Sequence, residues 1–107
     1  MTVLWWLLVG HAVCDYPLQG DFLARGKNHK NPIPGVPWMQ CLCAHALIQA
    51  GAVTLVTGSV ALGLAEFVCH FSIDFGKCSG WYGFNLDQSM HVACKAAWLL
   101  VWLSFRA

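Results

Sequence analysis

The sequence predicts an all-α integral membrane protein, a bundle of about four short transmembrane helices. Of its 107 residues, 58% are apolar and only 10% are charged, whereas soluble domains are about half apolar and about a quarter charged. The charged residues gather in the connections and at a few positions inside the apolar segments. A domain this small buries only about 60% of its unfolded surface, so we expect lipid to cover much of the apolar remainder.

Four apolar segments divide the chain, which we interpret as one transmembrane domain over residues 1–107. The first is short, because roughly 20 residues cross a hydrocarbon core and Pro17 is expected to end or kink its helix. The Thr-Gly-Ser segment at 57–59 leaves room only for a hairpin between neighbouring helices. Asn85 or Asp87 is expected to cap the last helix. The predicted spans are residues 2–16, 38–56, 59–76 and 85–105.

Residues 20–37 form the one long connection, in which charged residues are followed by three prolines. This composition indicates a solvated loop with a polyproline-like end. Its basic residues are Arg25, Lys27 and Lys30, and Lys77 lies in the third connection. Because basic residues stay on the cytoplasmic side, both connections are expected to face the cytoplasm and both termini to face the opposite side of the membrane.

The charge and cysteine content argue against several other classes of protein. A formal net charge of +1, without a basic stripe, gives no reason to expect a nucleic-acid partner. Cys14, Cys69 and Cys94 fall inside apolar segments, where cysteine packs as a small hydrophobe. Residues 3–9 are apolar like a signal peptide, but no basic residue precedes them, which favours retention as a membrane helix.

Polar side chains recur inside the predicted spans, mostly four residues apart. This spacing places them on one face of a helix, one turn from each other. A charged group at the bilayer centre costs about 2.5–3.5 kcal/mol on insertion scales, so these polar stripes are expected to face the bundle interior. The stripes are His11 and Asp15; His45 and Gln49; Glu66, His70 and Asp74; and Asp87, His91 and Lys95.

The stripes are expected to meet at one level of the bilayer, near the cytoplasmic side. Neighbouring helices run in opposite directions, so the end of one span is level with the start of the next. His45 follows the first connection, whereas His70 precedes the third connection and His91 follows it. Glu66 and Lys95 lie about one turn deeper and are expected to pair, a role as much structural as functional.

Imidazole nitrogen and carboxylate oxygen are the ligands of zinc and other divalent transition metals. The cluster therefore predicts a centre for one or two divalent ions, zinc or manganese. With an open position, such an ion brings the pKa of bound water to about 7 and supplies a nucleophile for hydrolysis, here of a lipid-linked phosphate or ester. The predicted ligands are His11, His70 and His91, with His45 as a fourth. The carboxylates predicted to ligate, to orient a ligand or to act as general base are Asp15, Asp74 and Asp87.

Three blocks resemble the signature of a small multi-spanning membrane-protein family of unknown function from bacteria and phages. They are HAVCDYPLQGDFL from His11, HFSIDFGK from His70 and DQSMH from Asp87, against a family pattern of H-x-x-x-D-F-x-L-Q, H-F-x-I-D-x-x-K and D-Q-x-x-H. The resemblance implies a bacterial inner-membrane location and adds Gln19 and Gln88 to the polar set. Lys77 and Asp21 lie in the same blocks and are further candidates. The chain departs from the pattern at Tyr16-Pro17.

The H-x-x-x-D blocks are also loosely similar to bacterial membrane-bound metal-dependent hydrolases, which favours the hydrolase hypothesis. Two alternatives stay open. A non-enzymatic ion or proton pathway, or a phage factor that modifies the host envelope, would use the cluster as a titrating relay. In a purely structural role, the polar stripes would hold together the bundle or a homo-oligomer. The lipid bilayer is the expected partner in every case.

Overall fold

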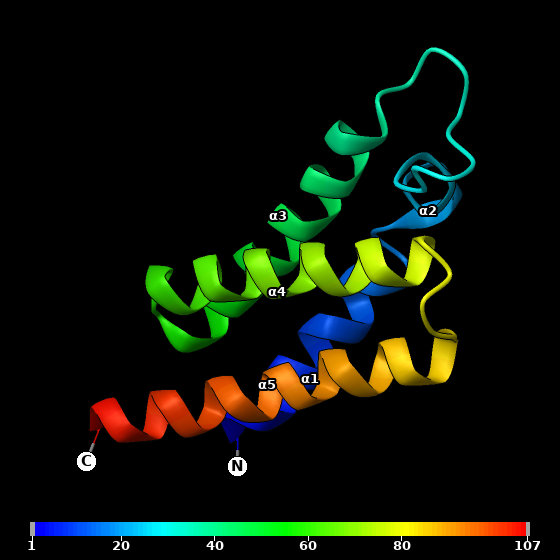
Figure 1. The fold of residues 1–107 in the computed structure, drawn as a ribbon. Helices are drawn as coiled ribbons and strands as arrows, with labels where there is room; N and C mark the ends of the chain where they lie inside the picture. The colour runs from blue at the N-terminus through cyan, green and yellow to red at the C-terminus, as the bar shows by residue number, and fades with distance from the viewer. Residues whose placement is uncertain (1, 107) are drawn as a thin grey trace.

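The computed structural model describes residues 2–106, and within them it contains five helices and no strand. The helices are α1 (Thr2–Asp15), α2 (Gly20–Gly26), α3 (Trp38–Thr57), α4 (Val60–Cys78) and α5 (Phe84–Arg106), drawn in Figure 1. The all-α prediction is confirmed. α1, α3, α4 and α5 match the four predicted helices within a few residues.

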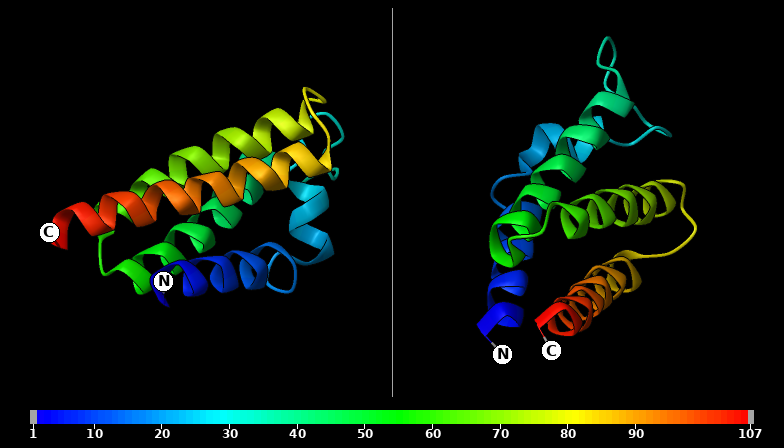
Figure 2. Two further views of the ribbon diagram at one scale, coloured as in Figure 1. Left: turned by 90° about the horizontal axis from the view of Figure 1, so that it is seen from below. Right: turned by 90° about the vertical axis from the view of Figure 1, so that its left-hand side faces the viewer.

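The four long helices close into a ring. α3 packs most extensively on α4, α1 packs on α3, α4 packs on α5, and α5 returns to α1. The resulting bundle measures 49 × 23 × 21 Å along its principal axes. Figures 1 and 2 show the two ends of the chain at the same end of the bundle as the α3–α4 turn, with α2 and the α4–α5 connection at the other end.

The ends of the long helices follow from local sequence. α1 ends at Asp15, two residues before Pro17, because proline lacks the amide donor that a continuing helix needs. α3 ends at Thr57 and is followed by Gly58 as its C-cap, whose φ of 72° suits a residue without a side chain. α4 then starts from Ser59, whose hydroxyl accepts a hydrogen bond from the Leu62 amide at 3.1 Å. The predicted hairpin at 57–59 is confirmed.

Two expectations about the connections are wrong. Residues 20–37 are not entirely loop, because α2 forms over Gly20–Gly26 after Gly20 turns the chain with a φ of 65°. α5 begins at Phe84, so neither Asn85 nor Asp87 precedes the helix as a cap. Asp87 instead lies in the first turn with its side chain buried.

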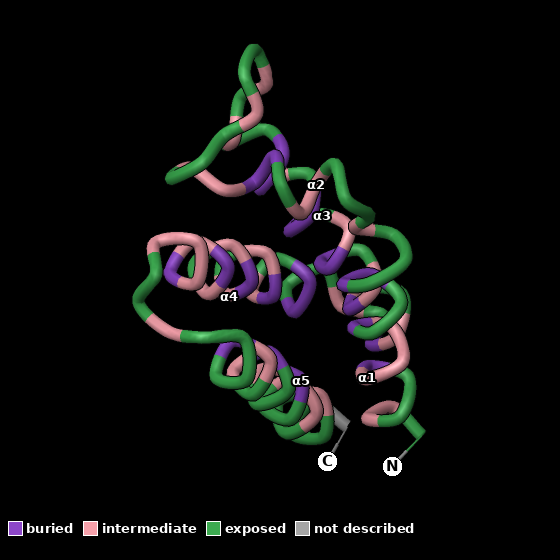
Figure 3. Tube along the Cα trace, turned by 90° about the vertical axis from the view of Figure 1, so that its right-hand side faces the viewer, coloured by how far each residue is buried: buried purple, intermediate pink, exposed green. Residues whose placement is uncertain are grey.

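The interior divides into an apolar half and a polar half along the bundle. Leu7, Val53 and Leu62 form the apolar core, flanked by Trp98 and Trp102, near the α3–α4 turn. The polar half lies toward α2 and the α4–α5 connection. Among the described residues, twelve buried side chains are polar or charged and eight are apolar. Figure 3 shows the buried positions of the long helices facing one another across the bundle.

The outer surface of the bundle carries many large apolar side chains, whereas most of the buried side chains are polar or charged. Twenty large apolar side chains are exposed in the described chain, including Leu55, Leu64, Val68 and Leu100. Of the described helices, α3 is long and apolar enough to cross a membrane, and α1 is apolar but shorter. A core helix of a water-soluble protein would meet the same criterion, so four spans stay a prediction.

Candidate metal centre

Polar side chains from all four long helices, and from the residue after α2, meet in one buried cluster. Each of them has a relative exposure of 7% or less. The members are His11, Asp15, Lys27, His45, Gln49, Glu66, His70, Asp74, Asp87, His91 and Lys95. The predicted stripes therefore face inward and meet in one cluster, which also includes Lys27.

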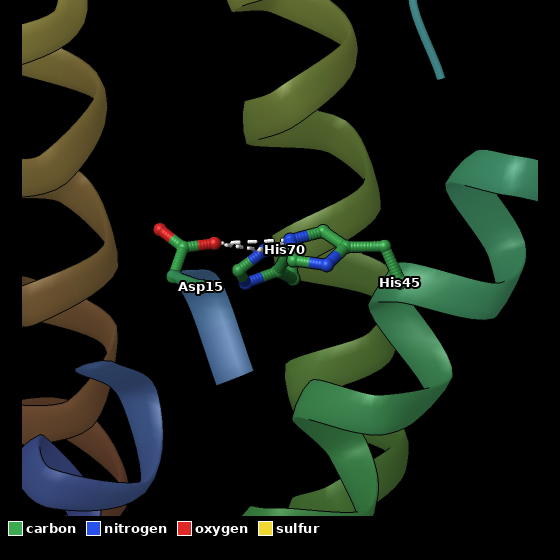
Figure 4. A group of neighbouring side chains, drawn as sticks. All are labelled: Asp15, His45 and His70. Atoms are coloured by element: carbon green, nitrogen blue, oxygen red, sulfur yellow. Dashed lines mark hydrogen bonds and ion pairs between the residues drawn. The ribbon is translucent and has the colours of Figure 1, made fainter. Parts of the chain in front are cut away.

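Four donor atoms form the centre of the cluster, and Figure 4 draws three of their residues. Nε2 of His45 lies 3.0 Å from Oδ1 of Asp15 and 3.1 Å from Nε2 of His70. Oδ2 of Asp74 lies 3.5 Å from the His45 nitrogen and 3.4 Å from the His70 nitrogen. The His70 nitrogen is 3.7 Å from the Asp15 oxygen. In a tetrahedral zinc site with bonds of about 2.0–2.1 Å, ligand atoms are roughly 3.3 Å apart.

Glu66 fixes how His70 faces these atoms. Oε2 of Glu66 lies 3.0 Å from Nδ1 of His70, while its Oε1 accepts hydrogen bonds from Nζ of Lys95 at 2.9 Å and from Nε1 of Trp98 at 2.8 Å. These donors hold Glu66 as an acceptor, so Nδ1 of His70 carries the proton and Nε2 presents its lone pair to the cluster. The predicted pairing of Glu66 with Lys95 is confirmed.

A second group of donor atoms lies around His91. Its Nε2 is 3.0 Å from Oδ1 of Asp74 and 3.5 Å from Oδ1 of Asp87. The side-chain amide of Gln88 donates to Oδ2 of Asp87 at 3.1 Å and to Oδ2 of Asp15 at 2.9 Å. Gln88, included because of the resemblance, therefore contacts the cluster directly.

Lys27 is the member that sequence reasoning missed. Its Nζ donates to Oδ2 of Asp74 at 2.7 Å and to Oε1 of Gln19. Gly26 lets the end of α2 lie against α3, because a side chain there would meet Sγ of Cys41. A lysine among glycine, asparagine and proline residues resembles a solvated loop residue, and the local sequence offered no signal of its burial.

The predicted ligand trio of His11, His70 and His91 is not the set that comes within ligand distance. Nε2 of His11 lies 3.1 Å from Oε1 of Gln88 and 3.8 Å from Oδ2 of Asp15, at the edge of the cluster. Its ring centroid is 6.3 Å from that of His70 and 5.4 Å from that of His91. His45 lies at the centre of the cluster instead, because α3 packs against α4 and places the His45 ring next to His70.

Two further candidates lie outside the cluster. Asp21 is exposed and pairs with Arg25 at 3.4 Å on the outer face of α2. The break after α1 and the turn at Gly20 remove Asp21 from the face that carries Asp15. Nζ of Lys77 lies 5.5 Å from the centroid of the Phe84 ring, a cation–π contact at the surface.

The family model described as a protein of unknown function (DUF3307) matches residues 3–107. The chain belongs to this family. Comparisons with curated proteins and with solved structures gave no significant match. The expectation of an uncharacterised family is confirmed, and all the cluster residues of this DUF3307 chain lie within the matched region.

In the cluster of this DUF3307 protein, carboxylates outnumber ammonium groups. Its four carboxylates face two ammonium groups, those of Lys27 and Lys95, so two negative charges remain when the histidines are neutral. Buried charges persist only when they are paired or bind a metal. The negative charge also affects a residue outside the cluster. Partial burial raises the pKa of Tyr82 in the α4–α5 connection, and the nearby carboxylates of Asp87 and Asp74 raise it further.

Either one divalent cation or two protons on the histidines would balance this charge. Three groups in the described chain place their donor atoms close enough to hold an ion. The group of Glu66, His70 and His91 is the least suited, because both Glu66 oxygens already accept hydrogen bonds. The other two groups are Asp15 with His45 and His70, and Asp74 with Asp87 and His91.

Proposed function

We propose that this DUF3307 protein is a membrane-embedded, metal-dependent hydrolase that acts on a membrane-associated phosphate or ester at the cytoplasmic leaflet. The observation that supports it best is the position of the His45 and His70 nitrogens, which lie 3.1 Å from each other and 3.0–3.7 Å from one oxygen of Asp15 and one oxygen of Asp74. Two imidazoles and two carboxylates suit zinc or manganese. If the ion keeps a further, open position beside these four ligands, as five-coordinate zinc or six-coordinate manganese does, it would bring the pKa of a bound water to about 7 and so supply the nucleophile.

The remaining side chains have roles that fit this chemistry. Glu66 orients His70 through Nδ1, as the outer partners of metal-binding histidines do. Lys27 places an ammonium group at the edge of the cluster nearest α2, where it can neutralise an anionic oxygen of the substrate. An apolar groove of about 470 Å³ opens between Trp38, Phe71 and Trp81 and offers room for an acyl chain.

The distribution of side chains supports a lipid surrounding. A water-soluble domain normally buries apolar groups and exposes charged ones, whereas here six Asp, Glu and Lys side chains are buried and many Leu, Val, Trp and Phe side chains are exposed. Intramembrane ionisable residues face the bundle interior and mark function. By the positive-inside rule the basic connections face the cytoplasm of a bacterial cell, and both termini face outward across the inner membrane.

A proton or ion pathway is less well supported. Such a pathway needs polar groups or water along the whole bundle. The buried polar network extends from Lys27 to Lys95 and Trp98, but Leu7, Val53 and Leu62 pack together beyond it. The polar network therefore ends inside the bundle, which does not fit a channel through it.

The test combines metal analysis with hydrolysis assays. The full chain is purified in detergent, loaded with Zn²⁺ or Mn²⁺, desalted and analysed for bound metal, and then assayed on phospholipids and lipid esters in vesicles. We expect bound metal and hydrolysis in the wild type, and in His45→Ala loss of hydrolysis together with less bound metal. His29→Ala is the matched control, because His29 stacks on Phe75 with ring centroids 4.2 Å apart, outside the cluster.

Each result separates the hypotheses. A wild type that binds no metal, or a His45→Ala protein that binds as much metal as the wild type, overturns the proposal. A purely structural role predicts that His45→Ala lowers stability while no metal is bound in either protein. Proton flux into liposomes that is independent of metal would favour the relay.

A further inference from the structure

We propose that the cluster holds a second metal ion, ligated by Asp74, Asp87 and His91 and joined to the first through the Asp74 carboxylate. The inference rests on the proposed function, because the second site shares a ligand with the first. It goes further by assigning a second ligand set and a substrate class.

Asp74 faces two different sets of donor atoms. Its Oδ2 approaches the nitrogens of His45 at 3.5 Å and His70 at 3.4 Å. Its Oδ1 lies 3.0 Å from Nε2 of His91. A carboxylate whose two oxygens point to different ligand sets is suited to bridge two ions, and two-metal hydrolases hold their ions about 3.5–4 Å apart.

Asp87 supplies an unused ligand atom at the second site. The residue is 2% exposed, and its Oδ1 accepts no hydrogen bond although it lies 3.5 Å from Nε2 of His91. A carboxylate near a helix N-terminus is stabilised by the helix dipole, which explains the charge but not the unpaired oxygen. A buried acceptor without a donor is unfavourable, and a cation between Asp87 and His91 removes that cost.

Gln88 holds the two sites at a fixed separation. Its side-chain amide donates both to Oδ2 of Asp15, a ligand of the first site, and to Oδ2 of Asp87, a ligand of the second. Each carboxylate thereby has one oxygen fixed by Gln88 and the other turned toward an ion. This arrangement connects α1 and α5 at the level where α4 contributes Asp74.

The two sites differ in how their histidines are supported. Glu66 orients His70 of the first site. Nδ1 of His45 in the first site and Nδ1 of His91 in the second are both buried without a hydrogen-bond partner, so the second site has no histidine with such support. Loss of such a partner typically weakens metal binding by about 10- to 100-fold. The first site therefore fills at lower metal concentration than the second.

The charge of the filled cluster indicates the substrate class. The first divalent ion compensates the two excess negative charges of the carboxylates. A second ion then leaves an excess of positive charge, to which Lys27 contributes. An anionic group such as a phosphate ester balances this charge, and a neutral carboxylic ester does not.

The experiment is a Mn²⁺ titration of the full chain in detergent, with bound metal counted after desalting and the ions observed by electron paramagnetic resonance. We expect two ions per chain, binding in steps separated by about 10- to 100-fold, and the spectrum of an exchange-coupled pair. His91→Gln and Asp87→Asn should each keep the tighter ion and lose both the weaker ion and the coupling. Asp21→Asn, with its exposed carboxylate, is the matched control and should keep both ions.

The possible outcomes separate this inference from the proposed function. One ion in the wild type, or two ions that persist in both His91→Gln and Asp87→Asn, overturns the second site while the first remains. No bound ion overturns both. Circular dichroism identifies a variant that has lost helix content, and the second variant then decides the result.

Discussion

Glu66 and His70 lie one turn apart on α4, with Oε2 of the carboxylate 3.0 Å from Nδ1 of the imidazole. The same carboxylate accepts hydrogen bonds from Lys95 and Trp98 of α5. The pair therefore couples the packing of α4 on α5 to the direction of the His70 lone pair. The Glu66 side chain therefore contributes both to the stability of the bundle and to metal affinity, and substitutions can test the two contributions separately.

Glu66→Gln combined with Lys95→Met should lower metal affinity by about 10- to 100-fold relative to Lys95→Met alone. The glutamine amide no longer fixes the proton of His70 on Nδ1, so the lone pair of Nε2 is not held toward the ion. The added Lys95→Met change avoids a buried unpaired ammonium, which would cost about 3–5 kcal/mol by itself. Competition with a chromogenic chelator measures both affinities. Equal values would contradict the orienting role of Glu66.

Lys27→Met should strengthen metal binding by about tenfold or more and slow the hydrolysis of an anionic substrate. The ammonium group lies 2.7 Å from Oδ2 of Asp74 and competes with an ion for that oxygen. Two unit charges about 4 Å apart near a protein surface interact by about 4 kcal/mol, and a tenfold change in affinity needs about 1.4 kcal/mol. Lys30→Met, at an exposed loop position, is the control. Unchanged affinity in Lys27→Met would show that the ammonium does not compete.

The helical spacing was sufficient to predict which residues enter the cluster from the long helices. A helix of known period fixes which side chains share a face, and burial of charge fixes which face turns inward. Glu66 and Lys95 could be paired on these grounds alone. The same reasoning could not show that His45, rather than His11, approaches His70, because the direction of each ring depends on its rotamer and on how the helices cross.

The burial of Lys27 could not be predicted from the sequence, for a different reason. Its burial depends on α2, a seven-residue helix too short to be recognised from a periodic pattern. The helix forms because Gly20 turns the chain with a positive φ and because Gly26 permits close contact with Cys41. These are tertiary effects, and the glycines and prolines around them indicated a loop.

Gly76→Ala should lower the free energy of unfolding by about 1–3 kcal/mol, the usual cost of overpacking. A Cβ atom at Gly76 would lie within 3.0 Å of the Tyr82 ring, and the Tyr82 hydroxyl donates to the carbonyl of Ile73. The ring must move and that hydrogen bond must weaken. Unfolding in a denaturing detergent series measures the change.

The control for this substitution is Gly51→Ala, in the middle of α3. No atom lies within 4 Å of the position that its Cβ would take, so alanine meets no obstacle and gains helix propensity. Its stability should equal or exceed that of the wild type. Equal losses in both variants would indicate a general intolerance of α3 and α4 to added volume, and would contradict a specific role for Tyr82.

Val68→Asp tests the lipid surrounding directly. Val68 lies on α4 between Glu66 and His70 in sequence, but its side chain points outward and is 62% exposed. In a bilayer, an aspartate near the helix centre costs about 2.5–3.5 kcal/mol, so the variant should insert poorly and accumulate less. In water the same exposed change would alter stability by only about 0.5 kcal/mol.

Alkaline carbonate extraction of cell membranes, followed by quantification of the pellet, measures the outcome for Val68→Asp. Leu64→Asp, one turn earlier on the same exposed face, should behave alike, and Asn85→Asp, at the exposed start of α5, should match the wild type. Wild type and Val68→Asp recovered together in the soluble fraction would contradict the membrane assignment. The metal centre would still be testable, because its ligands are gathered by contacts among the helices themselves, and those contacts do not depend on what surrounds the bundle.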